Sequence, residues 1–370
     1  MENNSKLAIF DLDSITYIVA YKFRNKKAKH LVERATRKFI QEILTNIEAT
    51  DYIGFYINKD KEAKPNFRYA ISDTYKANRP PTPDFIIEWR PTIMEVYDSM
   101  GFLPVEGIES DDAVSITADK YRMQYSEVYI VTSDKDLRQI ESTIFYNLNN
   151  HSIELIDRFA AKKHLVYQAL MGDSADNIPG LPGIGKGKAA TMLEEAESIC
   201  DLYKILITEY KKYSELKLKL IRSKIRKEKE EEFKTQIDEL ITAHIPGLEL
   251  NKAQMNRQID ILLDEYIKEE YAADFAIAAW RDYLKQQYRL VKLLVAEEAP
   301  LFDFNIPIPL KTELQDPAET LQKFIATDSS ATQATDATVT EDKAVAEEKT
   351  TTTNIKPSSK GDVDKILSLF

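Results

Sequence analysis

The chain of 370 residues contains one cysteine, Cys200, and four histidines, and no apolar run in it approaches the roughly 18 residues that cross a bilayer. One cysteine cannot form an intramolecular disulfide, and four histidines leave few ligands for a structural zinc ion. The N-terminus also lacks a basic stretch followed by an apolar signal segment. We therefore expect a soluble, cytoplasmic protein that does not contact membranes.

Basic residues are also outnumbered by acidic ones. The chain has 50 lysines and arginines and 61 acidic residues, which gives a net charge of −11. This balance argues against binding nucleic acid through uniform positive charge, although it allows a local basic patch. The length corresponds to about two ordinary domains, which can bury a substantial core.

Four short apolar runs are typical of buried strands, at 7–10, 52–57, 128–132 and 143–148. Helical patterns lie between them, among them 31–47 and 85–100, and Pro91 is a candidate kink in the second. Strands that alternate with helices favour an α/β fold with a mostly parallel central sheet flanked by helices.

The second half of the chain differs in composition. Residues from about 193 to 294 carry long charged helical patterns, and the alternating charges of 217–234 are typical of a solvated helix face. After residue 324, Ala, Thr, Ser, Asp and Glu dominate, so this segment cannot bury enough apolar surface to fold. It ends in a mostly apolar cluster formed by Ile366, Leu367, Ser368, Leu369 and Phe370.

Carboxylates gather at places where an α/β sheet binds ligands. Asp11 directly follows the first predicted strand, and Asp134 and Asp136 follow the strand 128–132, so these acids lie at carboxyl ends of strands. Two further groups complete a set of eight acids, namely Glu109, Asp111 and Asp112 at a helix start and the pair Asp173 and Asp176.

A single group of these acids has a simpler interpretation as helix capping or surface charge. If the groups converge, however, their repulsion requires divalent cations with oxygen ligands, and magnesium is the natural candidate. Two such ions would activate a water and stabilise a leaving oxygen, which is the chemistry of phosphodiester hydrolysis.

Basic and aromatic residues that suit a nucleic acid lie in two places. Arg68, Tyr75, Lys76 and Arg79 are interleaved ahead of a proline pair, as expected where rings stack on bases and cations bind phosphates. A solvated loop with scattered aromatics is the alternative. A glycine-rich turn then leads into a helix and can present amides and ammonium groups to a duplex backbone, through Gly180, Gly183, Gly185, Lys186 and Lys188.

In this order, the motifs resemble the 5′-nuclease superfamily, which includes flap endonucleases, bacteriophage 5′-to-3′ exonucleases and the 5′-nuclease domain of bacterial DNA polymerase I. The resemblance runs from about 7 to 193 and is most specific at 75–81, 107–112, 132–137 and 172–185. It implies a PIN-like catalytic core at 1–170 with a helical arch at about 58–100. A helix-three-turn-helix and helical DNA-binding region would occupy 171–324, followed by a disordered tail at 325–370.

The resemblance also implies the roles of site residues. Two Mg²⁺ ions, replaceable by Mn²⁺, would bind at two sites: the first formed by Asp11, Glu109, Asp111 and Asp112, the second by Asp173 and Asp176, with Asp134 and Asp136 between. Lys76 and Arg79 would stabilise the scissile phosphate at the base of the arch, and Tyr75 would stack on a base. The hairpin 180–188 would hold duplex backbone and a K⁺ ion.

Three features depart from the superfamily. Relatives commonly carry an Asp after the second strand, where this chain has Asn58, so one ligand is missing or is replaced by Asp60. Asp13 is an additional acid without an assigned role, and the helices at 199–256 are longer than in compact phage relatives. Residues 367–370 resemble sliding-clamp docking peptides, with Ile366 in the place of a glutamine.

Two other functions are compatible with parts of the sequence. Residues 10–14 also resemble the nucleophile motif of haloacid dehalogenase phosphatases, in which Asp11 would attack phosphorus and Asp13 would act as acid and base. An inactive subunit that binds flap DNA is the non-enzyme alternative. We expect a monomeric 5′ nuclease that acts in replication or repair, in a bacterium or phage-infected cell, on DNA with a 5′ single strand and also on RNA in hybrids.

Overall fold

The structure is a computed structural model that describes residues 4–25, 28–57, 66–270 and 280–312. The expected clamp-docking peptide at 366–370 and the tail around it lie outside the described residues, as do Asn58 and Asp60.

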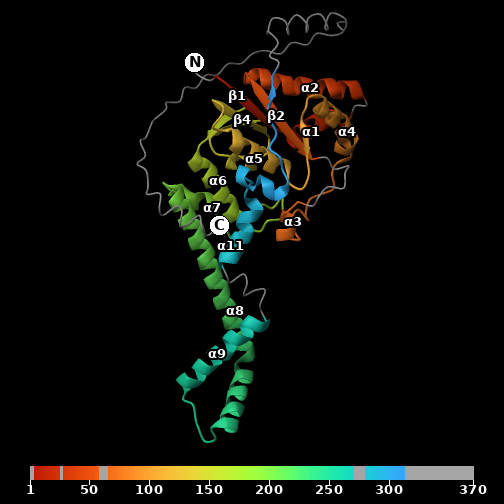
Figure 1. Cartoon of the computed structure of the whole chain (residues 1–370). Helices are drawn as coiled ribbons and strands as arrows, with labels where there is room; N and C mark the ends of the chain where they lie inside the picture. The colour runs from red at the N-terminus through yellow and green to blue at the C-terminus, as the bar shows by residue number, and fades with distance from the viewer. Residues whose placement is uncertain (1–3, 26–27, 58–65, 271–279, 313–370) are drawn as a thin grey trace, which may run out of the picture.

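A seven-stranded, mostly parallel sheet forms the centre of the protein (Figure 1). Six strands follow the order β3-β2-β1-β4-β5-β6, and β7 pairs antiparallel with β2. The strands are β1 (Lys6–Asp11), β2 (Asp51–Ile57), β3 (Leu103–Val105), β4 (Glu127–Thr132), β5 (Thr143–Asn147), β6 (Ile153–Ile156) and β7 (Leu310–Lys311). The order reverses between β1 and β4, and such a switch point is where open α/β sheets bind ligands at the carboxyl ends of their strands.

Helices cover both faces of the sheet. In β1, Ala8 and Phe10 point to one face and Leu7 and Ile9 to the other, and all four are completely buried. The first face packs against α1 (Leu12–Lys22), α2 (Lys29–Asn46) and α4 (Asp84–Ser99). The second face packs against α5 (Ser110–Tyr121) and the segment that follows the last helix. This three-layer α/β arrangement confirms the fold class predicted from the sequence.

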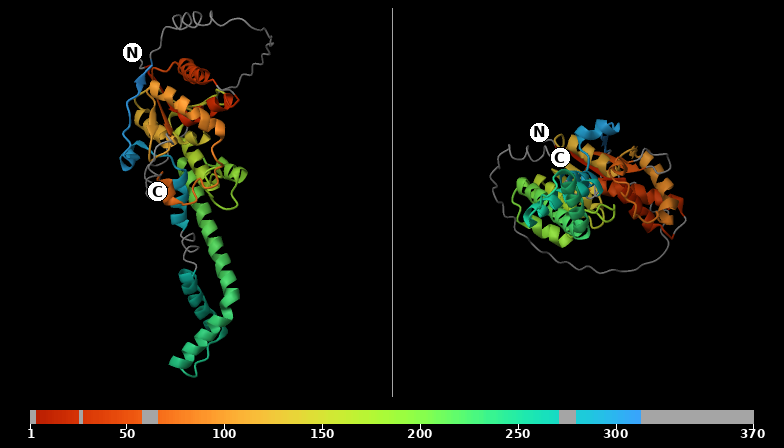
Figure 2. Two further views of the ribbon diagram at one scale, coloured as in Figure 1. Left: turned by 90° about the vertical axis from the view of Figure 1, so that its right-hand side faces the viewer. Right: turned by 90° about the horizontal axis from the view of Figure 1, so that it is seen from below.

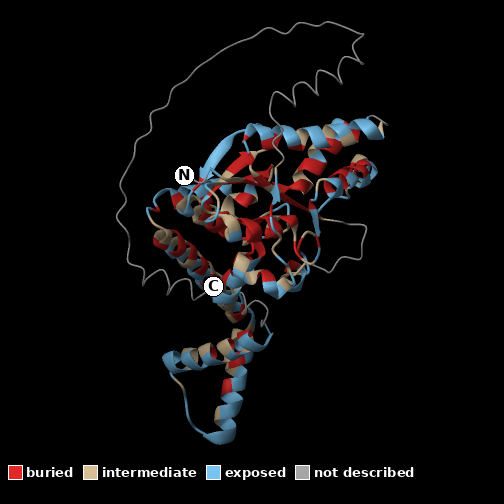
Figure 3. Cartoon of the chain, turned by 45° about the horizontal axis from the view of Figure 1, so that its top comes forward, coloured by how far each residue is buried: buried red, intermediate tan, exposed pale blue. Residues whose placement is uncertain are grey.

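The described part of 158–291 is mainly helical, and its outer portion extends away from the sheet (Figure 2). A separate apolar cluster joins α6 (Arg158–Met171), α7 (Lys186–Glu194), the first part of α8 (Ile199–His244) and α11 (Trp280–Val291). The outer part of α8 pairs with α9 (Lys252–Glu270), and we call residues 211–270 the helical leg. Figure 3 shows that the leg is largely exposed, in contrast to the buried body.

Short elements complete the fold, namely α3 (Arg68–Ile71) and the 3₁₀ helices η1 (Lys135–Gln139) and η2 (Ala296–Phe302). After α11 the chain returns to the sheet, where β7 pairs with β2, so residues 296–311 pack on the core. The predicted boundary of a helical region at 171–324 differs from the structure in this last part. Among the described helices, none is both long enough and apolar enough to span a membrane.

The four strands predicted from apolar runs are confirmed as β1, β2, β4 and β5, and the two predicted helices as α2 and α4. Pro91 lies within α4. Strands β3, β6 and β7 are not predicted from the sequence, because they have only three, four and two residues and contain too few apolar positions to form a pattern.

Candidate functional site

Asp11 is the last residue of β1 and lies at the switch point of the sheet. It is only 2% exposed, and its Oδ2 accepts hydrogen bonds from Ser14 Oγ at 2.6 Å and Thr132 Oγ1 at 2.7 Å. Oδ1 has no hydrogen-bond partner in the part of the chain that the structure describes. Burial, followed by the charge of Asp13, raises the pKa of Asp11 to about 6. A buried carboxylate oxygen with free lone pairs is suited to a cation.

Asp134 and Asp136 follow β4 at the same edge of the sheet. Asp134 Oδ1 accepts the Asp136 N–H at 2.8 Å, and the Asp134 N–H donates to Thr132 Oγ1 at 2.9 Å. Burial and the charge of Asp134 raise the pKa of Asp136 to about 7. The Lys135 ammonium lies 2.8 Å from an Asp136 oxygen and 3.5 Å from an Asp173 oxygen, and so links two acidic segments.

The third group of acids opens α5. Glu109 is the N-cap of this helix and forms a capping box with Asp112, which fixes the first turn. Burial and the charges of Asp11 and Asp134 raise the pKa of Asp111 well above its ordinary value. The structure therefore brings Asp11, Asp111 and Asp134 together from three separate segments of the chain.

The segment 75–79 binds two of the acids. Tyr75 Oη donates to Glu109 Oε2 at 2.9 Å and to Asp176 Oδ2 at 3.2 Å. Lys76 pairs with Glu109 and lies 3.7 Å from Asp176 Oδ2, while Arg79 Nε donates to Asp176 Oδ1 at 3.1 Å. Burial alone would raise the pKa of Glu109, but the neighbouring cations, Lys76 foremost, lower it below its ordinary value.

The loop 172–180 carries the last two acids, Asp173 and Asp176. Asp173 and Ile178 exchange two backbone hydrogen bonds of 2.8 and 2.7 Å, which close the loop. Gly172 and Gly180 have φ values of +76° and +60°, and a Cβ at Gly172 would lie 2.2 Å from the Ile178 carbonyl oxygen. Only glycine fits at these two positions, and the two acids are held in a fixed turn.

These contacts join seven of the eight predicted carboxylates along one edge of the sheet. We call them the acidic edge: Asp11, Glu109, Asp111, Asp134, Asp136, Asp173 and Asp176. Within residues 4–25, 28–57, 66–270 and 280–312, no group of three His, Cys, Asp or Glu side chains is arranged to hold one metal ion. Instead the ammonium and guanidinium groups of Lys76, Arg79 and Lys135 lie among the acids and offset their repulsion.

Asp112 and Arg68 require a correction to their predicted roles. Asp112 is completely buried and Arg68 is 3% exposed, and they form a bidentate pair of 2.6 and 2.9 Å. The Leu294 N–H donates to Asp112 Oδ1, and the carbonyls of Leu290 and Lys292 accept from Arg68. Because these bonds occupy both side chains, Asp112 is not free to bind metal directly and Arg68 cannot reach a nucleic acid.

Tyr75 and Gly180 also differ from expectation. Tyr75 is 2% exposed, and its ring packs edge-on against Tyr69 with centroids 5.5 Å apart, so it is not available to stack on a base. The Gly180 N–H donates to Gln287 Oε1 at 3.0 Å and its carbonyl accepts from Tyr283 Oη at 2.6 Å. The Gly180 amide is therefore already paired and cannot bind a phosphate.

The remaining residues of the predicted hairpin are accessible. Gly183, Gly185, Lys186 and Lys188 are all exposed, and Gly185 is the N-cap of α7. Gly183 has a φ of +81°, and a Cβ there would meet no atom within 4 Å, so its glycine is required by conformation alone. This turn presents exposed backbone and two ammonium groups at a helix N-terminus.

Several side chains at the site have no local motif that could have revealed them. Asp13, to which the sequence assigns no role, accepts hydrogen bonds from the Ile57 N–H at 3.3 Å and Ser110 Oγ at 2.8 Å. It thereby joins the end of β2 to the start of α5. Gln139 and Gln287 bind backbone groups more than 100 residues away in the sequence.

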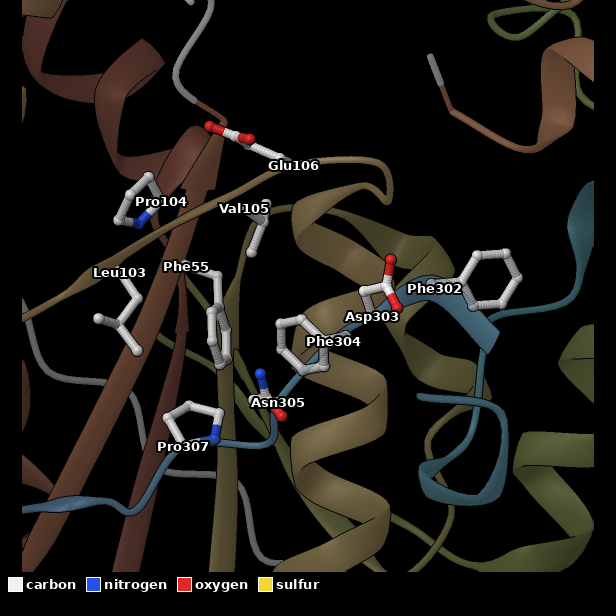
Figure 4. Close-up of a pocket in the computed structure, with 10 residues that line it drawn as sticks. All are labelled: Phe55, Leu103, Pro104, Val105, Glu106, Phe302, Asp303, Phe304, Asn305 and Pro307. Atoms are coloured by element: carbon white, nitrogen blue, oxygen red, sulfur yellow. The ribbon is translucent and has the colours of Figure 1, made fainter. Parts of the chain in front are cut away.

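A pocket of about 330 Å³ lies between β3 and the returning segment 302–307 (Figure 4). Phe55 and Phe304 face each other in it, with ring centroids 5.8 Å apart. Its described lining is mostly apolar and includes no member of the acidic edge. The chemistry of the site is therefore not located in this pocket.

Comparison with known proteins identifies one family over most of the described chain. The 5'-3' exonuclease, N-terminal resolvase-like domain matches residues 6–166, and the 5'-3' exonuclease, C-terminal SAM fold matches residues 159–259. DNA polymerase I from Thermus thermophilus is 32% identical over 182 residues, which are 47% of this chain and 22% of the polymerase. A 5'-3' exonuclease from Buchnera aphidicola is 33% identical over 152 residues, which are 38% of this chain and 53% of that protein.

The chain thus spans about half of the Buchnera relative and about a fifth of the polymerase. Among solved structures, zinc-bound T5 5'-exonuclease aligns with a TM-score of 0.45 and 15% identity over 77% of this chain and 98% of that one. The catalytic core of Rad2 in complex with DNA substrate aligns with a TM-score of 0.37 and 14% identity over 68% of this chain and 75% of that one.

Proposed function

Since the chain belongs to the 5'-3' exonuclease family of 5′ nucleases, as its motifs predict, we propose that it is a divalent-metal-dependent 5′ nuclease. Its substrate would be DNA in which a 5′ single strand meets a duplex, and its reaction the hydrolysis of a phosphodiester near that junction. The observation that supports this most directly is the acidic edge, where buried acids from four segments of the chain repel one another.

The carboxylates of the acidic edge have the chemistry to bind divalent cations, although the described ones are not gathered around one point while Lys76, Arg79 and Lys135 lie among them. Asp11 Oδ1 is buried without a partner among the described residues, and burial, followed by repulsion from neighbouring acids, keeps the pKa of Asp11 and Asp136 high. We propose that Asp11, Glu109 and Asp111 hold one Mg²⁺ and that Asp173 and Asp176 hold another, with Asp134 and Asp136 between them. Mn²⁺ would substitute, because it has the same preference for carboxylate oxygens. Bound metal would supply an activated water and stabilise the leaving oxygen.

Lys76 and Arg79 would contribute by changing partners. Both cations now bind carboxylates, Lys76 at Glu109 and Asp176 and Arg79 at Asp176. With these acids neutralised by bound cations, the ammonium and guanidinium groups would be free to bind the oxygens of the scissile phosphate. There they would offset the negative charge that develops during displacement.

The duplex would bind along exposed positive charge beyond the acidic edge. The first contact with the duplex would be made by the exposed residues of the hairpin, which are Gly183, Gly185, Lys186 and Lys188. We propose that the same hairpin holds a K⁺ ion. The segment 211–227 of α8 continues the contact, with eight lysines and arginines and a single acid, Glu215. Lys219, Lys224 and Lys227 are exposed there, and none of them forms an ion pair with any described residue. Such charges position a polyanion without reading its sequence.

We also propose a second substrate and a protein partner. RNA in hybrids would be a second substrate, and the protein would act as a cytoplasmic monomer in replication or repair.

The peptide Ile366–Phe370 would dock on a sliding clamp through its apolar side chains. Deleting residues 366–370 should leave cleavage of naked substrate unchanged and abolish capture by immobilised clamp; equal capture of both forms would contradict the docking role.

The proposed activity is tested with a 5′-flap duplex labelled at its 3′ end, incubated in Mg²⁺ and resolved on a denaturing gel. We expect cuts at the junction that disappear with EDTA and with Asp134→Asn, while Asp134→Asn still binds DNA. A ladder that shortens from the 5′ end would assign an exonuclease mode instead.

Failure to cleave in both Mg²⁺ and Mn²⁺ would contradict the proposed function. DNA binding without turnover would then identify an inactive binding subunit. Release of phosphate from a phosphomonoester would identify the phosphatase suggested by residues 10–14, although that chemistry assigns no role to Glu109 or to Asp111 beside Asp11.

A further inference from the structure

Helix α11 and the three residues after it form hydrogen bonds next to three of the acidic segments, although they lie outside the residues 6–259 that match the family. The helix packs between α3, α6 and α8, and Figure 1 shows it beneath α5 and α6, next to α3. Three sets of hydrogen bonds are made by different turns of α11 and by the three residues that follow it.

The first contact fixes the loop that carries Asp173 and Asp176. Tyr283 Oη donates to the Gly180 carbonyl at 2.6 Å, and Gln287 Oε1 accepts the Gly180 N–H at 3.0 Å. Gln287 is only 2% exposed, so this pair of bonds is protected from water. Gly180 closes the loop, and its backbone packs so tightly on Gly172 that a Cβ would come within 2.3 Å of the Gly172 nitrogen.

The second contact fixes the start of α5. The carbonyls of Leu290 and Lys292 each accept from Arg68 at 3.0 Å, and the Leu294 N–H donates to Asp112 Oδ1 at 3.1 Å. Asp112 lies one residue after Asp111 and completes the capping box of Glu109. The first turn of α5, with its two acids, is thereby attached to the end of α11.

The third contact fixes η1, which carries Asp136. Gln139 Nε2 donates to the Val291 carbonyl at 2.8 Å, and Gln139 Oε1 accepts the Leu293 N–H at 3.2 Å. One amide side chain therefore satisfies both a donor and an acceptor of the segment after α11. Three separate acidic segments thus share one rigid support.

We propose that residues 280–294 are a brace that sets the spacing of the acidic edge, with Gln287 and Gln139 as positioning residues. This inference rests on the proposed function, because only catalysis requires the acids at a defined separation. Carboxylates repel one another and would move apart unless packing held them, and a misplacement of about 1 Å can cost on the order of 100-fold in rate.

The brace predicts an effect on site geometry that ordinary packing would not produce. Gln287→Leu keeps the volume of the side chain but removes the acceptor for the Gly180 N–H, and Tyr283→Phe removes the donor to its carbonyl. Tyr288→Phe is a matched control, since it removes a buried hydroxyl of the same helix that lies 3.1 Å from Tyr203 Oη on α8. Lys285→Gln controls for an exposed change on α11.

The first measurement is hydrogen exchange of a peptide covering 172–181 in EDTA, without DNA. We expect faster exchange in Gln287→Leu and Tyr283→Phe than in either control, by about tenfold for one lost hydrogen bond. Equal exchange in all four variants would overturn the brace. This readout does not depend on any nuclease activity, so it separates the brace from the proposed function.

The second measurement is single-turnover cleavage of the 5′-flap duplex across a Mg²⁺ titration. Gln287→Leu and Tyr283→Phe should require several-fold more Mg²⁺ for half-maximal rate and should cut over a wider range of positions, while substrate affinity is unchanged. A lower rate with unchanged Mg²⁺ requirement and cut position would show a merely structural role and contradict the proposal. If the unmodified protein fails to cleave, the proposed function fails, and the exchange experiment still decides the brace.

Discussion

The acidic edge and the helical leg hold charge in opposite ways. At the edge, Asp11 and Asp111 are buried among like charges that raise their pKa values. In the leg, Arg226 pairs with Asp260 at 2.7 Å across two helices, and both side chains remain about one third to one half exposed. Charges in the leg are thus solvated and balanced locally, whereas the edge keeps an unfavourable arrangement.

The edge therefore loses stability by keeping acids that its proposed function requires, whereas the leg does not. The leg has a small apolar core of its own, which includes Ile225, Phe233 and Leu263, and its ion pairs join neighbouring turns of one helix or the two paired helices. Nothing in such a surface requires a ligand. The edge contains acids that only cations can neutralise, which is typical of sites that bind metal or perform acid and base chemistry.

The largest expected effect comes from Asp111→Asn. Cleavage should fall by at least about 100-fold, because the amide cannot help to hold a divalent ion at the edge. In EDTA the same variant should melt at a higher temperature than the unmodified protein, since it removes a repelled charge. Scanning fluorimetry and the flap assay measure the two effects.

Asp238→Asn in the leg is the matched control, because Asp238 is exposed. It should change neither cleavage nor melting temperature. If Asp111→Asn lowered the melting temperature in EDTA, the acidic edge would not be a strained cluster and the contrast with the leg would fail.

The second-largest effect is a difference in stability between variants of two ion pairs, one buried and one exposed. Arg68→Gln leaves Asp112 buried and unpaired, which should lower the free energy of unfolding by about 3 to 5 kcal/mol. Arg226→Gln removes an exposed pair in the leg and should cost no more than about 1 kcal/mol. Urea unfolding of both variants measures the difference. Equal costs would show that burial does not distinguish the two regions.

The third effect is a dependence of stability on pH. The pKa of Asp11 is about 6 and that of Asp136 about 7, both raised from 3.8, so the folded state binds more protons than the unfolded state between about pH 4 and 7. Stability in EDTA should therefore fall as pH rises through this window, on the order of 3 kcal/mol for Asp11 alone.

His164 works against this trend, because burial lowers its pKa to about 4 and its folded form loses stability as the pH falls. The double variant Asp11→Asn and Asp136→Asn isolates the two acids. It should be more stable than the unmodified protein at pH 8 and similar to it at pH 4 in urea unfolding. A constant difference between the two proteins at all pH values would rule out titration as the cause.

The acids of the edge could be predicted from sequence because each belongs to a short local pattern. Asp11 ends β1 and Asp134 comes two residues after β4, and parallel strands bring their carboxyl ends to one edge. The roles of Asp112 and Arg68 could not be predicted. The two residues are 44 positions apart, and the Leu294 N–H that donates to Asp112 is a further 182 positions along the chain. Whether a charged residue faces a ligand or a buried partner depends on contacts that no local pattern contains.

The same limit applies to aromatic and glycine residues. Tyr75 and Gly180 lie in motifs that suit nucleic acid, yet one packs in the core and the other binds α11. Lys186 and Lys188, in the same hairpin as Gly180, are exposed. A motif therefore identifies a candidate segment, while the fold determines which of its residues are accessible.

The smallest expected effect comes from the leg itself. Replacing Lys219, Lys224 and Lys227 together by Gln should leave stability unchanged, because these exposed lysines form no ion pair among the described residues. If they contact duplex phosphates, the slope of log affinity against log salt should decrease by roughly 0.9 per lost contact, or about 2.7 in all. Fluorescence anisotropy with a catalytically inactive Asp134→Asn background measures the slope.

The matched control for these lysines replaces Lys22, Lys120 and Lys285 by Gln, which removes the same charge from exposed positions outside the leg. An equal decrease in both triple variants would mean that only net charge matters and that α8 offers no particular track for DNA. A decrease confined to the α8 variant, and seen only with duplex arms long enough to extend past the hairpin, would give the leg a function. The leg would then differ from the acidic edge in what its charges bind, phosphate in place of metal, as well as in how they are held.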